Sequence, residues 1–324
     1  MKRLNDLYIK MIDKNNIYKA YCNAREGKGH YRDVKLFESN VTLHIDKLHD
    51  MLANDEFANS EYVVFDRFTG GKWRTICKLP FYPDRIVHHC IVQILHPIWL
   101  NLLIRDTFST IEGRGIHDGV KRIKSALKDV EGTQYCLKID IKKYYPSINH
   151  DVLKDILARK IKDARLINLL NIIIDSAEGI PIGNYISQWF GNIYLSYFDH
   201  YVKEVIGVKY YYRYADDMIF LSSNKEFLHK CLSLVRDYLI LNLKLEIKSN
   251  YQIFPVEKRG IDMLGYRFFH THTLVRKSIV KNFKRKIKNN NASKRTQSAY
   301  WGWFKHANAY NLTNKYFNHE RIKN

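Results

Sequence analysis

The segment from Tyr212 to Leu221 places two adjacent carboxylates between two runs of residues that favour extended chain. Aromatic and branched residues flank Ala215-Asp216-Asp217, so the pattern predicts a β-hairpin with the acids at its turn. Side chains alternate between the two faces of a strand, so the two acids cannot both point fully the same way, and we take Asp216 as the better metal ligand. An isolated Asp-Asp pair is more often a solvated turn. Other segments must therefore decide between these interpretations.

A second carboxylate lies near the end of another strand-forming run. Residues 135–141 are nearly continuously apolar and carry Asp140. A carboxylate at the end of a buried strand is unfavourable unless it is paired or bound to a cation. Asp140 and Asp216 converge if their strands are neighbours in one sheet. Such a pair suits phosphoryl transfer to a 3′-hydroxyl, in which carboxylates hold two Mg²⁺ ions roughly 3.5–4 Å apart.

The charge balance indicates a polyanionic partner. The chain has 324 residues, and its 46% hydrophobic and 27% charged content is ordinary for a folded protein of one or two domains. Lys and Arg outnumber Asp and Glu by 53 to 33, which gives a net charge of +20. Nucleic acid is the first candidate partner. An acidic membrane surface is the weaker alternative, because the basic residues recur throughout the sequence and are not confined to one amphipathic helix.

Cysteine and histidine usage points away from disulfide and zinc chemistry. The five cysteines are odd in number, widely spaced and without a CxxC pair, which favours a reducing cytoplasm. Adjacent ligands diverge on a helix, so His88, His89 and His96 are expected in packing and surface roles. The start lacks the apolar run of a signal peptide, and polar residues interrupt the apolar stretch 91–104. We expect a cytoplasmic protein with no membrane partner.

Hydrophobic periodicity predicts a mixed order of helices and strands. Helices are expected over most of residues 1–60 and over 84–104, 149–162, 166–176, 187–206 and 225–242. A hairpin is expected from strands 62–65 and 73–76 joined through 69–72, with further strands at 243–247 and 263–269. A stripe of apolar residues should bury one helical face near the N-terminus, made by Leu36, Phe37, Val41, Leu43, Ile45, Leu48 and Leu52.

Two basic sites upstream of the carboxylates allow more than one interpretation. Lys72 and Arg74 are either solvated charges of an edge strand or contacts to a triphosphate, for which Arg offers a planar fork and Lys a point charge. The glycine-rich loop 108–119 carries Arg114 but lacks the spacing of a P-loop. It is either a plain loop or a contact to phosphates through backbone amides and Arg114.

The C-terminal region combines a basic segment with an aromatic one. Residues 276–288 carry no acid, and their candidate nucleic-acid-binding residues are Arg276, Lys277, Lys281, Lys284, Arg285, Lys286 and Lys288. Such a helix is typical of contact with a phosphate backbone, and a solvated helix is the alternative. The aromatic run 300–304 favours packing between the last helices over base stacking.

Taken in this order, the motifs resemble the reverse transcriptases from about residue 62 to the C-terminus. The sequence Tyr-Ala-Asp-Asp at 214–217 resembles their catalytic hairpin, and 138–148 resembles their first metal-binding strand. Segments 74–85 and 113–115 resemble the bacterial, group II intron-like branch. The resemblance implies an α+β right-hand polymerase fold. Its parts are an N-terminal helical extension at 1–60, fingers at 61–134, a palm with an antiparallel sheet at 135–270 that includes a finger insertion at about 150–182, and a helical basic thumb at 271–324.

The resemblance also implies roles for individual residues. Asp140, Asp216 and Asp217 become the catalytic carboxylates that bind two Mg²⁺ ions, with Mn²⁺ as a substitute ion and the Ile141 carbonyl as an extra ligand. Tyr145 matches the bulky residue that excludes a 2′-hydroxyl. The implied nucleotide-binding set is Lys72, Arg74, Ile141, Lys142, Lys143, Tyr144, Tyr145, Ile182, Gly183 and Lys248, the last assisting departure of pyrophosphate.

One departure from the common family pattern narrows the subtype. Most members have Gln-Gly followed by Ser-Pro in this loop, whereas this chain has Ile182-Gly183 followed by Ser187-Gln188. That form is similar to the reverse transcriptases of diversity-generating retroelements, which copy a template-repeat RNA with errors opposite adenine for mutagenic retrohoming. A net hydrogen bond is worth about 0.5–1.5 kcal/mol, so replacing Gln by Ile removes up to roughly tenfold in selectivity. Ile182 and Gln188 are therefore the candidate fidelity residues, and simple packing is the alternative for Ile182.

The resemblance implies template RNA, cDNA and deoxynucleoside triphosphates as partners, together with a small basic oligomeric accessory protein. A retron, defence or group II intron-like enzyme of ordinary fidelity is the first alternative function. A catalytically silent RNA-binding scaffold is the remote one. A scaffold has no need to keep Asp140, Asp216 and Asp217 together, which argues for an enzyme.

Overall fold

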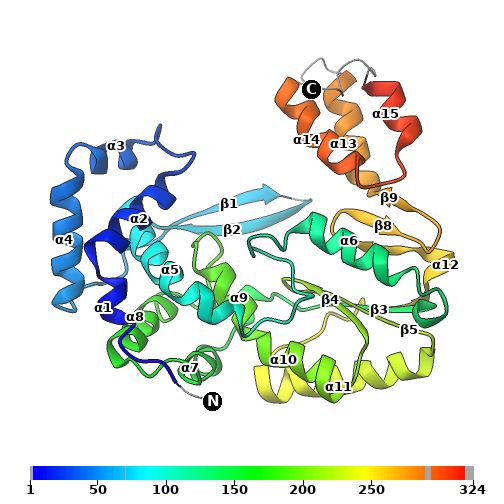
Figure 1. Cartoon of the computed structure of the whole chain (residues 1–324), viewed down its shortest axis with the longest axis horizontal. Coiled ribbons are helices and arrows are strands. Elements are labelled where there is room, and N and C mark those ends of the chain that lie inside the picture. Colours follow the sequence, from blue (N-terminus) through cyan, green and yellow to red (C-terminus); the bar gives the residue numbers. More distant parts are fainter. Residues whose placement is uncertain (1–2, 70, 289–292, 318–324) are drawn as a thin grey trace. The chain divides into compact units, whose positions relative to one another are not determined.

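The computed structural model describes residues 3–69, 71–288 and 293–317 (Figure 1). It divides into two compact units, each built from separate stretches of the chain. The first unit comprises Met1–Ile104, Lys142–Tyr201 and Asp237–Glu246, and the second comprises Arg105–Ile141, Val202–Arg236 and Ile247–Asn324. Among the described residues, no helix has both the length and the apolar character needed to cross a bilayer.

The first unit begins with the four helices expected near the N-terminus, which are α1 (Tyr8–Met11), α2 (Lys14–Arg25), α3 (Arg32–Glu38) and α4 (Val41–Ala53). Asn40 caps α4 by accepting a hydrogen bond from the backbone of Leu43. The expected apolar stripe is partly wrong, because Leu36 is 67% exposed and Leu43 is 43% exposed. The helical structure is interrupted between α3 and α4, so these residues do not share one continuous helical face.

The buried carboxylate of Asp163 ties the N-terminal segment to the rest of the first unit. Its Oδ2 accepts hydrogen bonds from the backbone N–H groups of Leu7 and Tyr8, both at 2.8 Å. Its Oδ1 accepts from the N–H of Leu166, 3.2 Å away, and so caps helix α8 (Ala164–Ile174). One side chain therefore satisfies three backbone donors in two distant segments.

Asp163→Ala is expected to lower the free energy of unfolding by about 2 kcal/mol, because it removes a helix cap and leaves buried N–H groups without acceptors. Denaturant unfolding measures this loss. The exposed Asp151 in the first turn of helix α7 (His150–Ala158) provides a control, and Asp151→Ala should change stability by less than about 1 kcal/mol. Equal losses in both variants would show that Asp163 does not anchor the segment.

The expected hairpin is present in the first unit and is longer than predicted. Strands β1 (Val63–Thr69) and β2 (Lys72–Lys78) pair antiparallel, with Arg67 opposite Arg74 and Thr69 opposite Lys72. Because side chains alternate along each strand, Lys72 and Arg74 share one face of this ribbon with Arg67 and Lys78. Its other face carries Phe68 and Trp73, whose ring centroids lie 5.4 Å apart. The four cations of the hairpin thus share one face, and the Phe68–Trp73 pair lies on the other.

The remaining helices of the first unit follow the predicted order with different ends. After the π-helical turn η1 (Phe81–Arg85), α5 spans Ile86–Leu100, so the predicted helix 84–104 is too long at both ends. Asn149 caps α7 as expected, accepting from the N–H of Val152 at 3.1 Å. The predicted helix 187–206 is divided into α9 (Ser187–Tyr194), α10 (Ser196–His200) and η4 (Tyr201–Val205). The break coincides with Ser196, whose hydroxyl donates to the carbonyl of Ile193.

The second unit is built on a four-stranded antiparallel sheet with strand order β4-β5-β3-β6. Its strands are β3 (Tyr135–Asp140), β4 (Tyr210–Tyr214), β5 (Asp217–Ser222) and β6 (Gln252–Pro255). Helix α11 (Lys225–Leu243) agrees with the prediction, but the strand expected at 243–247 is wrong. Lys244 adopts a φ of +53° and the N–H of Leu245 bonds back to Leu239, so the chain completes a helix end there. The edge strand β6 takes the place of the predicted one.

A smaller sheet and further helices complete the part of the second unit that the structure describes. The strand predicted at 263–269 is instead divided between β7 (Ile261–Met263) and β8 (Tyr266–Phe268) by a turn in which Leu264 and Gly265 have positive φ, and β9 (Thr273–Val275) follows. The other elements of this unit are α6 (Ile116–Ala126), η2 (Glu131–Thr133), α12 (Val256–Arg259), α13 (Lys277–Lys288), α14 (Lys294–Phe304) and α15 (Tyr310–Tyr316). The loop expected over 108–119 therefore ends at Gly115.

Aromatic packing holds the last helices together, as the run at 300–304 predicts. The buried ring of Phe283 lies with its centroid 5.0 Å from that of Tyr300, 4.9 Å from Phe304 and 5.4 Å from Phe317. These residues belong to one hydrophobic cluster with strands β7 to β9 and part of the main sheet. The basic face of α13 is thus supported by a packed core.

Candidate active site

The acidic hairpin forms where the sequence predicts it. Ala215 and Asp216 make a two-residue turn between β4 and β5, and Tyr214 pairs with Asp217 across it. Ala215 has a φ of +51°, an uncommon conformation for a residue with a Cβ. Arg213 is fully buried, and its Nη1 donates to the carbonyl of Ala215 at 3.1 Å. A buried guanidinium therefore stabilises the strained turn that presents Asp216.

The second predicted carboxylate lies beside this hairpin. Strands β3 and β5 are neighbours, and Asp140 is directly opposite Asp217 in their register. The expectation that the two acidic segments meet in one sheet is confirmed. Lys248 follows them at the same end of the sheet, with its N–H donating to the carbonyl of Asp140 at 2.9 Å and its Nζ 2.6 Å from Asp140 Oδ2.

The negative charge of Asp140 acts on the nearby carboxylate of Asp216. Burial, followed by the negative charge of Asp140, raises the pKa of Asp216 to about 6, against a weaker opposing effect of Lys248. The Oδ1 atom of Asp140 is buried without a hydrogen-bond partner. Two acids whose ionised forms destabilise each other, one of them with an unsatisfied oxygen, provide a place where a cation would be stabilised.

Asp217 has different partners from Asp216. Its Oδ1 lies 3.0 Å from Nζ of Lys138, and Lys138 also donates to the carbonyl of Asp262. Asp262 in turn accepts from Nε of Arg276 at 2.7 Å. Burial raises the pKa of Asp217, and Lys138 opposes that shift. Asp217 therefore links the main sheet to the smaller one, which leaves Asp216 as the acid that pairs with Asp140.

The ligand set offered by these acids is small. Within residues 3–69, 71–288 and 293–317, no group of three or more His, Cys, Asp or Glu side chains is close enough together to hold a metal ion. Mg²⁺ is commonly bound by one or two carboxylates together with water and substrate phosphates. The pair Asp140 and Asp216, with the unsatisfied Asp140 oxygen, fits that mode of binding. It does not fit a closed all-protein site.

The predicted residues around Tyr145 belong to the first unit. The ring of Tyr144 is buried, and its hydroxyl donates to the carbonyl of Gly191 in α9. A Cβ at Gly191 would lie only 3.1 Å from the ring of Tyr145, which follows in the 3-10 turn η3 (Tyr145–Ser147). Gly191 therefore makes the space in which the Tyr145 ring lies. Lys142 is exposed and pairs with Glu246 at 2.9 Å, while Lys143 adopts a φ of +45°.

The predicted fidelity residues lie in the loop between α8 and α9 and in the first turn of α9. The Ile182 side chain is half-buried, and its carbonyl accepts from the N–H of Cys77 in β2 at 2.8 Å. Gly183 is required beside it, because a Cβ there would lie 2.4 Å from the Cys77 carbonyl oxygen and φ is +135°. Gln188 is exposed in the first turn of α9. The loop thus joins the strand that carries Lys72 and Arg74.

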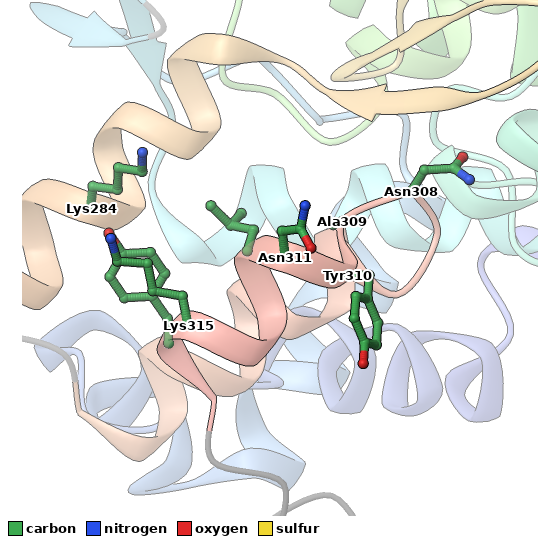
Figure 2. A pocket seen from close by; sticks show the side chains of 8 residues that line it. Lys284, Asn308, Ala309, Tyr310, Asn311 and Lys315 are labelled. Atoms are coloured by element: carbon green, nitrogen blue, oxygen red, sulfur yellow. The ribbon is translucent and has the colours of Figure 1, made fainter.

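The predicted nucleic-acid-binding cations differ in their exposure. Arg276 is occupied by Asp262 and Arg114 is half-buried. The exposed ones on α13 are Lys277, Lys281, Lys284, Arg285 and Lys286, and the side chain of Lys288 lies outside the described residues. A cavity of about 430 Å³ lies next to this helix. It is lined by Lys284, Lys315, Tyr316 and the segment from Asn308 to Leu312 (Figure 2). Its lining is basic and amide-rich, and none of the three aspartates contributes to it.

Sequence reasoning missed Lys138, although a signal for it exists. It is the one basic residue of β3, and it lies two positions before Asp140, so both point to the same face of the strand. A lysine in an otherwise apolar strand requires a carboxylate or carbonyl partner. The role of Asp262 carries no such signal, because its contact with Lys138 joins segments 124 residues apart.

A model of the reverse transcriptase (RNA-dependent DNA polymerase) family matches residues 67–268, which is more than half of the chain and includes all three aspartates. The chain belongs to this family. It is 28% identical over 149 residues to protein YkfC of Escherichia coli strain K12, a match that covers 42% of this chain and 39% of YkfC. It is 27% identical over 174 residues to an uncharacterized 91 kDa protein in the cob intron of Schizosaccharomyces pombe, covering 50% of this chain and 21% of that protein. The chain thus spans less than half the length of either curated relative.

Solved reverse transcriptase family structures confirm the fold. The structure of apo telomerase from Candida tropicalis matches with a TM-score of 0.50 and 14% identity, covering 66% of this chain and 48% of that one. The structure of telomerase from Candida albicans in complex with a TWJ fragment of telomeric RNA matches with a TM-score of 0.52 and 12% identity, covering 79% and 55%. At these identities the likeness shows the fold alone. The α+β right-hand polymerase fold expected from the motifs is therefore confirmed.

Proposed function

We propose that this reverse transcriptase family member is an RNA-directed DNA polymerase that uses Asp140 and Asp216 to hold divalent metal ions. The observation that supports this most directly is the meeting of the two carboxylates at one end of the β3–β5 pair, where Asp140 disfavours the charge of Asp216. Bound Mg²⁺ would supply activation of the attacking 3′-hydroxyl and stabilisation of the leaving oxygen. Mn²⁺ is the expected substitute, and the Ile141 carbonyl is a further proposed ligand.

Other residues of the chain position the aspartates and contact the phosphates in this proposal. Lys138 holds Asp217, and Arg213 holds the turn, so Asp216 is fixed in position before any substrate binds. Lys248 places a positive charge beside Asp140, where it balances the carboxylate and is available to a departing pyrophosphate. We assign phosphate contacts to Lys72 and Arg74, whose shared ribbon face also carries Arg67 and Lys78.

The remaining nucleotide contacts are proposed around Tyr145. The ring of Tyr145 excludes a ribonucleotide 2′-hydroxyl in this proposal, and Gly191 provides its space. We assign its neighbours Lys142, Lys143 and Tyr144 to the same nucleotide-binding segment. Outside this segment, we assign template RNA and cDNA to the exposed cations of α13 and to Arg114. The fingers, palm and thumb boundaries at residues 61, 135 and 271 remain part of the proposal.

We further propose that the enzyme is of the diversity-generating type and makes errors opposite adenine, with a small basic accessory protein as its partner in a bacterial or phage-infected cytoplasm. The supporting observation is that Ile182 and Gly183 replace the common Gln-Gly, and that the Ile182 side chain is only half-buried. An intron-type enzyme of ordinary fidelity is the second candidate, favoured by the match to a protein in the cob intron.

Primer extension on an RNA template that contains adenines, followed by sequencing of the product, tests both parts of the proposal. We expect Mg²⁺-dependent cDNA whose substitutions concentrate opposite adenine. Accurate cDNA would favour the intron-type candidate. RNA binding without extension under any metal would favour a catalytically silent scaffold and would contradict the polymerase proposal.

Ile182→Gln is expected to lower misincorporation opposite template adenine by up to about tenfold, because the amide restores a hydrogen bond worth about 0.5–1.5 kcal/mol. The measurement is the error spectrum of the same extension reaction. Ile172→Gln provides a matched control, since Ile172 is 40% exposed and lies on α8, outside the loop. An error spectrum that Ile182→Gln leaves unchanged would assign Ile182 to packing.

A further inference from the structure

The loop that carries Ile182 rests directly on the backbone of two segments in the first unit. The N–H of Ile180 donates to the carbonyl of Tyr145 at 2.9 Å, and the carbonyl of Ile182 accepts from Cys77. Gly179 has a φ of +60°, and a Cβ there would lie 2.5 Å from the carbonyl oxygen of Pro146. The loop 178–184 therefore lies between the proposed sugar-selecting residue and the proposed phosphate-binding strand, with no room for a side chain at its closest contact.

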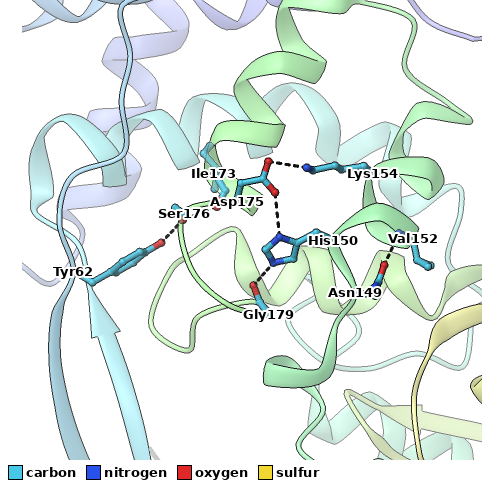
Figure 3. A network of polar contacts seen from close by, with 9 residues as sticks. All are labelled: Tyr62, Asn149, His150, Val152, Lys154, Ile173, Asp175, Ser176 and Gly179. Atoms are coloured by element: carbon cyan, nitrogen blue, oxygen red, sulfur yellow. Dashed lines mark hydrogen bonds and ion pairs between the residues drawn. The ribbon is translucent and has the colours of Figure 1, made fainter.

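His150 holds this loop from helix α7, as Figure 3 shows. Its Nε2 lies 2.8 Å from the carbonyl oxygen of Gly179, and its Nδ1 lies 3.1 Å from Oδ1 of Asp175. Lys154, one turn further along α7, donates to the other oxygen of Asp175 at 2.6 Å. His150 thus connects Asp175, at the C-terminal end of α8, to Gly179 in the loop.

The two acceptors determine the protonation of this histidine. A carbonyl and an ionised carboxylate can only accept hydrogen bonds, so each ring nitrogen of His150 must carry a hydrogen for both contacts to form. The imidazolium satisfies both, whereas a neutral ring satisfies one. Lys154, with a smaller contribution from His150, holds the pKa of Asp175 below its usual range against the opposing effect of burial. The Asp175 carboxylate is therefore an ionised acceptor for His150.

Further hydrogen bonds hold this loop and the end of α8. The hydroxyl of Ser176 donates to the carbonyl of Ile173 at 2.7 Å, so Tyr62 donates to Ser176 at 2.8 Å, as Figure 3 shows. The Tyr62 hydroxyl also accepts from Nδ2 of Asn184 at 2.9 Å.

We propose that His150 is a positioning residue for nucleotide selection, which holds the Gly179 carbonyl and thereby fixes the loop that carries Ile182 against Tyr145. The proposal rests on the polymerase function proposed above. Removing the ring nitrogens releases both contacts of His150. Selectivity and affinity for the incoming nucleotide then weaken, while turnover at saturating nucleotide stays the same, because the contacts of His150 are to Asp175 and Gly179.

Three substitutions separate this role from a purely structural one. His150→Phe keeps a ring and removes both donors. His150→Arg keeps a planar cation that can donate to both acceptors and does not lose its proton. His229→Phe is the matched control, because His229 is exposed on α11.

Single-nucleotide incorporation by the full chain, measured at one fixed pH, provides the first readout. For His150→Phe we expect KM for the correct nucleotide and the misincorporation ratio to exceed the wild-type values about three- to tenfold, with kcat at saturating nucleotide equal to that of the wild type and of His229→Phe. His150→Arg should keep the KM of the wild type. An unchanged KM and error ratio in His150→Phe, or an equal fall in its kcat, would overturn the proposal.

Amide hydrogen exchange of the protein alone provides a readout that does not require catalysis. His150→Phe should accelerate exchange at two N–H groups: that of Ile180, which bonds from the loop to Tyr145, and that of Cys77, which bonds to Ile182 in the loop. His229→Phe should leave both exchange rates unchanged. Unchanged exchange would overturn the positioning role even if DNA synthesis is observed. Absence of DNA synthesis in the wild type would instead overturn the polymerase function, and with it the selection role, whatever the exchange result.

Discussion

Asp216→Asn is expected to reduce DNA synthesis at least about a thousandfold while leaving RNA binding and the fold intact. Asparagine keeps the shape of the side chain but removes the negative charge that would hold a divalent ion together with Asp140. Losing several kcal/mol of charge stabilisation in the transition state corresponds to three or more decades in rate. Primer extension under single-turnover conditions measures the loss, and filter binding to the same RNA measures what is retained.

The neighbouring acids make this prediction specific. Asp140→Asn should match Asp216→Asn, because the two carboxylates act on the same ion. Asp217→Asn should cost less activity and lower thermal stability instead, because Lys138 already neutralises Asp217 and links it to Asp262. The exposed Asp237 on α11 serves as the control for an Asp→Asn change. A chain in which Asp217→Asn is inactive and Asp216→Asn is active would reverse our assignment of the metal ligand.

The meeting of the acidic segments was accessible from the sequence because it depends on local rules. A near-continuous apolar run and an aromatic hairpin both favour strands, and an acid at the end of each restricts how those strands can pair. Helix α11 and the cap at Asn149 are likewise determined by nearby residues. For these elements, local preference and tertiary packing agree.

The elements that the sequence did not predict depend on contacts between distant segments. Strand β6 ends in Pro255, and its short pattern is compatible with a loop until β3 pairs with it as an edge strand. The run from Met263 to Phe269 looks like one strand, although Gly265 and the positive φ of Leu264 fold it into a hairpin. His150 gives no signal of its own, since its partners Asp175 and Gly179 lie 25 and 29 residues away.

The same Asp216 is expected to make the metal-free protein less stable as the pH rises from about 4 to above 6. Its pKa is raised from 3.8 to about 6 in the folded chain, chiefly by burial and then by Asp140. Between these two values the folded state binds more protons than the unfolded state, so the free energy of unfolding falls with increasing pH. A pKa raised from 3.8 to about 6 corresponds to roughly 3 kcal/mol at most.

Denaturant unfolding of wild type and Asp216→Asn in the presence of a chelator measures this effect. The variant should equal the wild type near pH 4 and exceed it by roughly 3 kcal/mol at most at pH 7, because asparagine does not ionise. Adding Mg²⁺ at pH 7 should stabilise the wild type by binding the folded state and should have little effect on the variant. A variant that is no more stable than the wild type at pH 7 would mean that Asp216 is not held in an unfavourable charged state. If Mg²⁺ left both proteins unchanged, the two carboxylates would not be a metal site. The residue that gives the hairpin its expected activity is thus also the one that destabilises the empty fold, and both effects arise from its position beside Asp140.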